Sequence, residues 1–239
     1  ASQDCWRVMR NTIGYSIAFL ATDVLFGVLL AVLCYNLKSQ KALKAYHTTI
    51  ILPKFMSTVI IAYIVYALLA PTSGVINSLV VALGGERINW YAEPKYWPFI
   101  LTITHIWQTV GMNSVVYYAS LVGLDTELLE AAELDGANRV QKVWYVMVPH
   151  LTGVIIILTI LGIGSIFSGD FGLFYQVTKD QGVLYPTTDI INTYTFRALM
   201  GGSMEQSAAV GLFQSAAGCV MVVLTNLIVR RISPENSLF

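Results

Sequence analysis

The sequence contains little charge. Charged residues make up 12% of its 239 residues and hydrophobic residues 56%, whereas soluble globular domains carry roughly 25% charged residues. The chain therefore has too little charge to cover a water-exposed surface, and we expect lipid to surround much of it. Its formal net charge of zero also argues against a nucleic-acid partner, which would require a clustered basic face.

Residue types that serve catalysis or metal binding are also scarce. Cys5, Cys34 and Cys219 lie too far apart for a disulfide framework or for metal-ligand spacing, and we interpret them as small buried hydrophobic residues. The three histidines and the isolated carboxylates form no catalytic cluster, which disfavours a polytopic membrane enzyme. The phosphate-binding pattern G-x-x-x-x-G-K-[ST] is missing too, so the chain cannot bind ATP in that way.

Long apolar runs dominate what is present. A transmembrane helix needs about 20 predominantly apolar residues, and the sequence predicts five such spans in a single all-α transmembrane domain covering residues 1–239. The predicted spans are residues 11–35, 48–70, 99–121, 149–167 and 207–229. Pro53 and Lys54 near the start of the second span indicate a bent or interfacial first turn.

The polar connections give an orientation. Five spans alternate sides, so the loop after the first span, the loop at residues 123–149 and the C-terminal tail share one face. Positive charge marks the cytoplasmic face, and two of these segments carry it, at Lys38, Lys41, Lys44, Arg230 and Arg231. Arg7 and Arg10 fall on the opposite side, against this trend. We therefore expect residues 123–149 to be cytoplasmic and the loops at 71–98 and 168–206 to lie outside.

Residues 123–149 form the longest amphipathic, charge-rich segment between two apolar spans. Asp125 or Thr126 is expected as a helix N-cap, with Glu127 in the first turn. Gly136 is expected to end this helix, and a second short helix from about Asn138 leads to the next span. One interpretation is a connection that lies on lipid headgroups. The other is a docking surface for a protein, which is favoured because an acidic helix suits an anionic cytoplasmic leaflet poorly.

The spacing of this segment matches a known motif. In order, it reads Glu130, Ala131 and Ala132, three residues, Gly136, nine residues, and then Val146, Met147, Val148 and Pro149. This pattern resembles the EAA loop of ABC importer permeases, usually written EAA, three residues, G, nine residues, I-x-L-P. Two valines replace the usual Ile and Leu. The position before the penultimate span also fits that family.

Further stretches narrow the resemblance. They are residues 6–12, 88–90, 169–176, 185–186 and 189–194. These stretches resemble the polysaccharide or complex-oligosaccharide branch of the carbohydrate permeases, and the resemblance covers essentially the whole chain. Members of that family have six spans, so the resemblance implies that the N-terminal one is missing here.

The resemblance implies a type I ABC importer permease fold in a bacterial inner or plasma membrane. Such a permease is a non-catalytic subunit that translocates an oligosaccharide by alternating access. Its implied partners are a second related permease, two cytoplasmic ATPases that bind ATP and Mg²⁺, and an extracytoplasmic solute-binding protein. The chain itself would carry no cofactor. The residues implied to couple to the ATPase are Glu130, Ala131, Ala132, Asp135, Gly136 and Pro149.

A polar stripe on the predicted span 99–121 suggests a path for the sugar. Its members are Thr102, His105, Gln108, Thr109, Asn113 and Tyr117. Polar groups in a membrane helix face protein or a water-filled path, so these residues either contact sugar or form hydrogen bonds between helices. Asp23 and His105 also leave open an alternative function, an ion-coupled secondary transporter of a polar solute.

The long stretch at residues 168–206 is rich in aromatic residues. We expect Phe171, Phe174, Tyr175, Tyr185 and Tyr194 to help dock the binding protein or to gate the outer mouth, because long loops in compact proteins are often functional. An aromatic belt at the membrane interface is the alternative.

Overall fold

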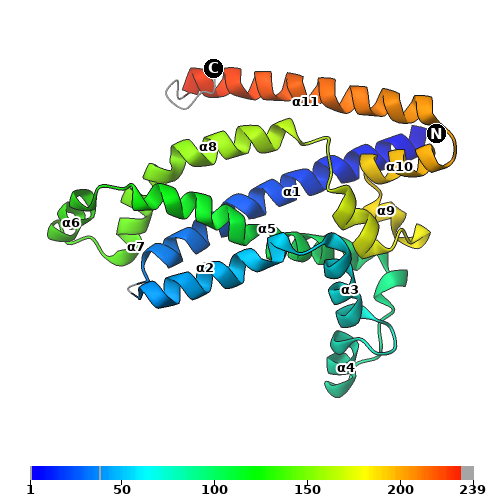
Figure 1. Ribbon diagram of the computed structural model, residues 1–239, viewed down its shortest axis with the longest axis horizontal. Helices are drawn as coiled ribbons and strands as arrows, with labels where there is room; N and C mark the ends of the chain where they lie inside the picture. Colours follow the sequence, from blue (N-terminus) through cyan, green and yellow to red (C-terminus); the bar gives the residue numbers. More distant parts are fainter. Residues whose placement is uncertain (1, 38, 233–239) are drawn as a thin grey trace. The chain divides into compact units, whose positions relative to one another are not determined.

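The computed structural model describes residues 2–37 and 39–232, and the regular structure within those ranges is entirely helical (Figure 1). The all-α prediction is therefore confirmed, whereas Lys38 lies outside the described residues. The chain divides into two compact units, which are described separately. Unit 1 comprises Ala1–Phe19, Met56–His105 and Gly164–Val220, and unit 2 comprises Leu20–Phe55, Ile106–Ile163 and Met221–Phe239.

The helices vary widely in length. The α-helices are α1 (Ser2–Tyr35), α2 (Gln40–Phe55), α3 (Thr58–Leu69), α4 (Val75–Ala82), α5 (Trp97–Val122), α6 (Thr126–Leu134), α7 (Arg139–Lys142), α8 (Val148–Gly164), α9 (Tyr185–Thr188), α10 (Ile191–Met200) and α11 (Met204–Ile232). The 3-10 helices are η1 (Trp90–Ala92), η2 (Pro94–Tyr96) and η5 (Gly182–Leu184), and η3 (Val143–Met147) and η4 (Leu173–Val177) are π-helices.

Three helical segments of the described chain are long and apolar enough to cross a membrane. They are Asp4–Tyr35, Arg139–Gly164 and Met204–Arg231. Helices α2 and α3 qualify only as a pair, and they are bent by 99° at the short break between them. The predicted second span is thus a broken helix whose bend follows Phe55, later than the Pro53 turn that the sequence suggested. The count of five spans is not confirmed, and the missing N-terminal span stays a prediction.

Several predicted spans differ from the structure, and the first begins at Asp4 instead of residue 11. The fourth span begins about ten residues earlier than expected, because the helical path is continuous from Arg139 to Gly164. The third span corresponds to α5, which has 26 residues but is not apolar enough to qualify. Polar side chains of the stripe lie along this helix, and they lower its apolar content.

Unit 1 has a core built from α1, α3, α5 and η4. Its most deeply buried large side chains include Trp97, Leu101 and Phe174. Phe174 packs edge-on against Tyr15 of α1, with ring centroids 4.6 Å apart. The stretch at residues 168–206, expected as a loop, consists mostly of short helices, and part of it is core.

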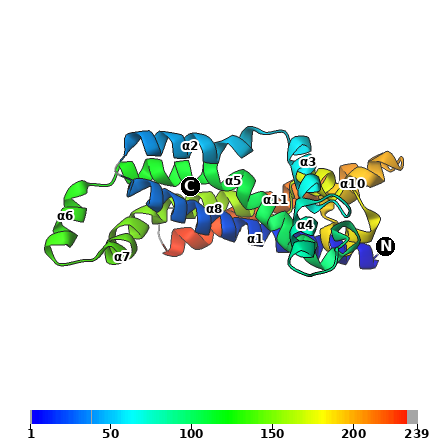
Figure 2. The same ribbon diagram turned by 90° about the horizontal axis from the view of Figure 1, so that it is seen from below.

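Unit 2 has a second core, formed by α1, α5, η3 and α8. Tyr117, Leu121 and Leu151 are almost completely buried there. Helix α2 lies beside α5 in both views (Figures 1 and 2), and a Cβ atom at Gly111 would collide with the backbone carbonyl of Ile50. A side chain at Gly111 would therefore force α2 and α5 apart.

The cysteines only partly match the sequence interpretation. Cys34 is buried, as expected of a small hydrophobic residue, but Cys5 and Cys219 are exposed. Both lie on helices that are long and apolar enough to cross a membrane, and such helices expose part of their surface to lipid.

Candidate functional site

Helix α6 begins as its sequence predicts. Asp125 is the N-cap, and its carboxylate accepts a hydrogen bond from the backbone N–H of Glu127 at 2.9 Å. Glu127 lies in the first turn, where the helix dipole favours a negative charge. Both features depend only on residues next to each other in sequence, and both are confirmed.

The end of α6 is a Schellman motif. The backbone N–H of Ala137 donates to the carbonyl of Ala132 at 2.9 Å, and that of Gly136 donates to Glu133 at 3.0 Å. Gly136 has φ of +81°, a conformation that costs other residues about 1–2 kcal/mol. The Schellman motif requires a residue with positive φ four positions after Ala132, and Gly136 occupies that position.

Helix α7 starts immediately afterwards. Asn138 and Gln141 form a reciprocal capping box, with distances of 2.9 and 2.7 Å. Lys142 of α7 reaches back to Glu133 of α6, with Nζ 3.0 Å from Oε2, and this hydrogen bond lowers the pKa of Glu133. The two short helices are thus held together by a charged pair, an arrangement that the sequence did not reveal.

The path from α7 into α8 contains a π-turn that sequence analysis missed. The backbone N–H of Val148 donates to the carbonyl of Val143, five residues earlier. Pro149 follows at once and has no N–H, and its ring would clash with the carbonyl of Tyr145 in a regular α-helix. The wider π-turn relieves that clash, so the helix passes through Pro149 without a break. Pro149 was the residue from which this π-turn could have been predicted.

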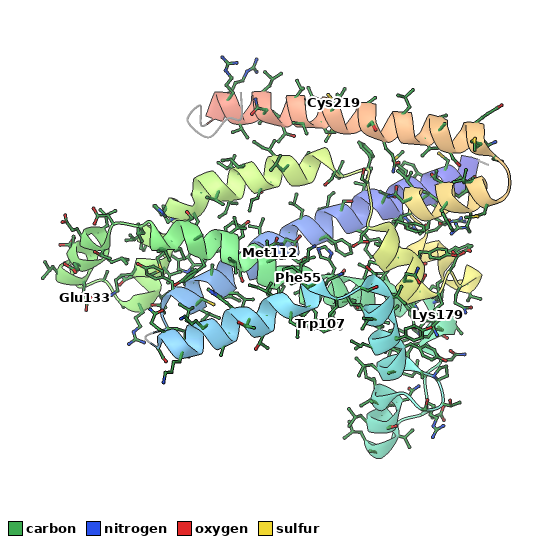
Figure 3. The ribbon with its side chains drawn as sticks, in the orientation of Figure 1. Phe55, Trp107, Met112, Glu133, Lys179 and Cys219 are labelled. Carbon is green, nitrogen blue, oxygen red and sulfur yellow. The ribbon has the colours of Figure 1, made fainter. Side chains whose placement is uncertain are left out.

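The surface of this segment carries exposed apolar side chains as well as acids. Glu130 and Ala131 are exposed and Ala132 is partly buried, while Leu134 is 90% exposed and Tyr145 is 78% exposed. Figure 3 labels Glu133 on α6, and Asp135 at the end of this helix is exposed as well. Exposed apolar groups rimmed by polar residues mark interaction surfaces. Leu134 and Tyr145 were not among the expected site residues.

Two members of the polar stripe fall in unit 1. The imidazole ring of His105 is stacked on Phe19, with ring centroids 3.8 Å apart and planes at 4°. The hydroxyl of Thr102 donates to the carbonyl of Pro98 in its own helix. His105 therefore contributes to a packed aromatic contact, while Thr102 is partly exposed.

The other four members fall in unit 2. Thr109 donates a hydrogen bond to the Asp23 carboxylate of α1, at 2.8 Å, which gives Asp23 a specific interhelical partner. Gln108 is buried, and its Oε1 atom has no hydrogen-bond partner within the described part of the chain. Tyr117 is also buried, and Asn113 is partly buried. The structure thus shows an interhelical hydrogen bond at Thr109 and an unused acceptor at Gln108.

The aromatic residues of the outer stretch differ in their contacts and in their exposure. Phe171 and Tyr175 stack with centroids 5.0 Å apart, and Tyr194 is 40% exposed. Tyr185 donates a hydrogen bond to the Asp180 carboxylate at 3.0 Å, and burial raises its pKa. Phe174 is only 1% exposed. Phe174 therefore presents no surface to a binding protein, which corrects the expectation for that residue.

Across residues 2–37 and 39–232, no group of three or more His, Cys, Asp and Glu side chains is arranged to hold a metal ion.

Residues 8–234 match the family model described as "Binding-protein-dependent transport system inner membrane component". The chain belongs to this family. An EAA motif with a coupling helix is typical of it, and the segment from Glu130 to Pro149 has that spacing. Members are non-catalytic permease subunits of ABC transporters, so the chain is an inner-membrane component and not an enzyme.

Similar proteins place the chain among sugar permeases. It is 31% identical, over 96% of its length and 71% of the relative's, to the polygalacturonan/rhamnogalacturonan transport system permease protein YteP of Bacillus subtilis. It is 30% identical to protein LplB of the same organism, over 98% of its own length and 73% of LplB. The resemblance to carbohydrate permeases is therefore confirmed.

A solved structure is similar over nearly the whole chain. A crystal structure of a bacterial ABC transporter that imports the acidic polysaccharide alginate contains a chain of 30% sequence identity, with a TM-score of 0.92. The match covers 98% of this chain and 81% of that one. A second structure of an alginate transporter, in complex with a pentasaccharide-bound periplasmic protein, matches with a TM-score of 0.89. The type I permease fold of this chain is thereby established.

Proposed function

We propose that this permease subunit forms part of the translocation path of an ATP-driven oligosaccharide importer. Its partners are a second related permease, two cytoplasmic ATPases and an extracytoplasmic binding protein. The observation that carries the proposal is the segment from Asp125 to Pro149, an exposed acidic helix with defined caps that continues into a membrane-spanning helix. ATP and Mg²⁺ are bound by the ATPases, and the oligosaccharide is released inward by alternating access.

Helix α6 is the part that seats on the ATPase. Ala131 and Ala132 are small enough for close approach, and the exposed Leu134 supplies apolar area that remains unburied in the chain alone. Glu130 and Asp135 flank this area and position it by charge. The pair between Glu133 and Lys142 supports this role, because it makes α6 and α7 move together.

A displacement of α6 is transmitted to the membrane-spanning helix α8 through a stiff connection. Gly136 sets the angle between α6 and α7, and Pro149 sits where the π-turn enters α8. The helical path has no interruption from Arg139 onward. A displacement of α6 by the ATPase therefore displaces the membrane helix as well, which is what alternating access requires.

The polar stripe on α5 is proposed to line the sugar path. Gln108 is the member best suited to bind sugar, because its buried Oε1 atom has no partner among the described residues and a sugar hydroxyl would satisfy it. Thr102 and Asn113 are partly exposed and supply further polar groups. Thr109 already donates to Asp23, which favours a packing role for that hydroxyl.

The outer aromatic residues are proposed to dock the binding protein. Phe171, Tyr175, Tyr185 and Tyr194 remain candidates, whereas the buried Phe174 is excluded. Support comes from the similar alginate transporter, which was crystallised with its periplasmic protein.

The docking proposal is tested by site-directed crosslinking in the complete transporter. In a background with Cys5 and Cys219 replaced by serine, Ala131→Cys is expected to crosslink to the ATPase subunit in a nucleotide-dependent manner. Ala82→Cys, on exposed α4 of the expected outer side, is the control and should not. Crosslinking from position 82 but not from 131 would reverse the assignment.

The alternative, an ion-coupled secondary transporter, makes an opposite prediction. It would use Asp23 and His105 as coupling groups, so uptake would continue without the ATPases and would stop when a protonophore is added. Uptake in proteoliposomes that requires ATP and tolerates the protonophore supports the importer. Uptake that continues without ATP and stops with the protonophore would support the secondary transporter instead.

A further inference from the structure

A groove with both polar and apolar lining lies between α3 and the end of η4, within unit 1. It has a volume of about 360 Å³ and is lined by Val59, Ala62 and Tyr63 of α3 and by Tyr175, Gln176, Lys179 and Asp180. Figure 3 labels Lys179 at this place. The groove combines flat aromatic rings, an amide and two charged groups. Tyr175 is also a candidate for docking the binding protein, whereas the other polar and charged residues of the groove have no role in the functions proposed above.

The two tyrosines offer surfaces for a sugar ring. Tyr63 is 66% exposed, although an amphipathic ring usually buries its apolar face. Tyr175 stacks on Phe171, which holds its ring in place. A pyranose has apolar C–H faces that suit such rings, while its hydroxyls need partners of the kind that Gln176 provides.

The charges of the groove are unequally compensated. Asp180 accepts a hydrogen bond from Arg197 at 3.0 Å and another from Tyr185 at 3.0 Å. Lys179 has no carboxylate within 4 Å in the described part of the chain, and its Nζ lies 3.0 Å from the centre of the Tyr66 ring. Arg197 is shared between Asp180 and the buried Asp189. Lys179 is thus the charged lining residue without a carboxylate partner in the described part of the chain, so a ligand that places an anion beside Lys179 is favoured.

The backbone at this point is in an uncommon conformation. Lys179 and Asp180 have φ of 55° and 47°, in the left-handed region that residues with side chains rarely adopt. The N–H of Asp180 donates to the carbonyl of Tyr175 at 3.2 Å, which closes the turn after η4. Two consecutive strained residues persist only where the surrounding structure holds them, and such positions cluster at functional sites.

We propose that this groove is a recognition subsite for a uronic acid residue of an acidic oligosaccharide. The sugar ring lies against Tyr63 and Tyr175, its carboxylate pairs with Lys179, and its hydroxyls bond to Gln176 and to the Asp180 carboxylate. The subsite rests on the proposed function as an oligosaccharide permease. An anionic lipid headgroup shares the charge but not the flat ring, so the two tyrosines favour a uronate.

The test uses the complete transporter in nanodiscs of zwitterionic lipid, without the binding protein. Trigalacturonate and the neutral galactotriose are titrated by calorimetry. Lys179→Met is expected to weaken trigalacturonate binding about tenfold or more, as for loss of a charge-assisted hydrogen bond, and to leave galactotriose binding unchanged. Lys179→Arg should retain most of the affinity for trigalacturonate.

A matched control uses the same residue type in a similar contact. Lys95 lies over the Tyr96 ring at 4.9 Å, but it is paired with Glu93 at 3.4 Å. Lys95→Met should leave both affinities unchanged. Tyr63→Ala should weaken binding of both sugars, because it removes the platform and not the charge.

Several outcomes would overturn the subsite. Equal trigalacturonate affinity in wild type and Lys179→Met would do so, as would an equal loss for both sugars in that variant. A Lys179 effect that appears only when anionic lipid is present would assign the groove to a headgroup. ATP-dependent uptake of another sugar with no trigalacturonate binding would remove the subsite but leave the proposed function. Absence of ATP-dependent sugar uptake would remove the proposed function itself.

Discussion

Arg7 of α1 donates a hydrogen bond to Asp189, which lies 182 residues later, with Nη2 3.2 Å from Oδ2. The Asp189 side chain is fully buried, and its second oxygen accepts hydrogen bonds from Arg197 and Thr193. A buried carboxylate with two guanidinium partners joins the start of the chain to its outer stretch. The aromatic groups near the groove are positioned on this framework within unit 1.

Replacing Asp189 should therefore be costly. Asp189→Asn removes the negative charge and leaves Arg7 and Arg197 without it, and breaking a buried ion pair costs about 3–5 kcal/mol. We expect a marked fall in thermal unfolding temperature of the detergent-solubilised protein. Asp4→Asn is the control, because Asp4 pairs with Arg7 at a half-exposed position where such pairs contribute about 1 kcal/mol or less. Equal shifts for the two variants would show that Asp189 is not the centre of this network.

Gly136→Asp should uncouple transport without loss of the protein from the membrane. A side chain at φ +81° strains the helix end by about 1–2 kcal/mol, and the charge changes the docking surface. Gly84 is a matched control, since it has φ of +84° and equally open surroundings on the expected outer side. We expect uptake and ATPase stimulation to be lost in Gly136→Asp and kept in Gly84→Asp. Comparable activity in both variants would argue against a coupling role for Gly136.

Pro149→Ala should stabilise the helix and impair transport. The new N–H can bond to the Tyr145 carbonyl, and interior prolines destabilise helices by about 3 kcal/mol, so the π-turn is expected to become regular α-helix. That change rotates the segment carrying Tyr145 relative to α8. Pro98→Ala, in the first turn of α5, adds an N–H that has no helical partner and should change little. Full uptake by Pro149→Ala, measured beside its unfolding temperature, would show that the π-turn is dispensable.

The hydrogen bond from Thr109 to the Asp23 carboxylate should contribute to transport. Thr109→Val removes the hydroxyl that donates to it at 2.8 Å while keeping the side-chain shape, and we expect slower sugar uptake with intact assembly. Thr104 donates to the Ile100 carbonyl of its own helix, so Thr104→Val serves as the control and should be close to neutral. If the two variants transport equally well, the interhelical bond has no part in the function.

The pair between Glu133 and Lys142 predicts a pH dependence. The hydrogen bond from Lys142 lowers the pKa of Glu133 below its ordinary value of 4.5. The stabilisation is present above the ordinary glutamate pKa and disappears as the pH falls through the lowered one. Lys142→Gln should therefore raise the Glu133 pKa towards 4.5, as measured by carbon NMR of labelled glutamate. An unchanged Glu133 titration in that variant would mean that the pair does not form in solution.

Much of the segment from Asp125 to Pro149 could be predicted because its determinants are local. Asp125, Gly136 and Asn138 act on backbone groups within five residues of themselves, so their roles follow from residue type and spacing. The π-turn escaped prediction, since a proline next to an apolar run also fits an ordinary helix start. The bend between α2 and α3 was expected nearer Pro53, whereas the structure places it after Phe55, where the two helices separate.

The sequence by itself determined the all-helical membrane class, the family and the capped helices between Asp125 and Lys142. Composition and short-range spacing are sufficient for these, because they depend on solvent and on neighbouring residues. Only the tertiary structure decided that Phe174 belongs to a core and that Thr109 serves Asp23. It likewise showed that Arg197 pairs with both Asp180 and Asp189, whereas Lys179 has no carboxylate within 4 Å among the described residues. Burial and charge pairing depend on partners that are distant in sequence, and only folding brings those partners together.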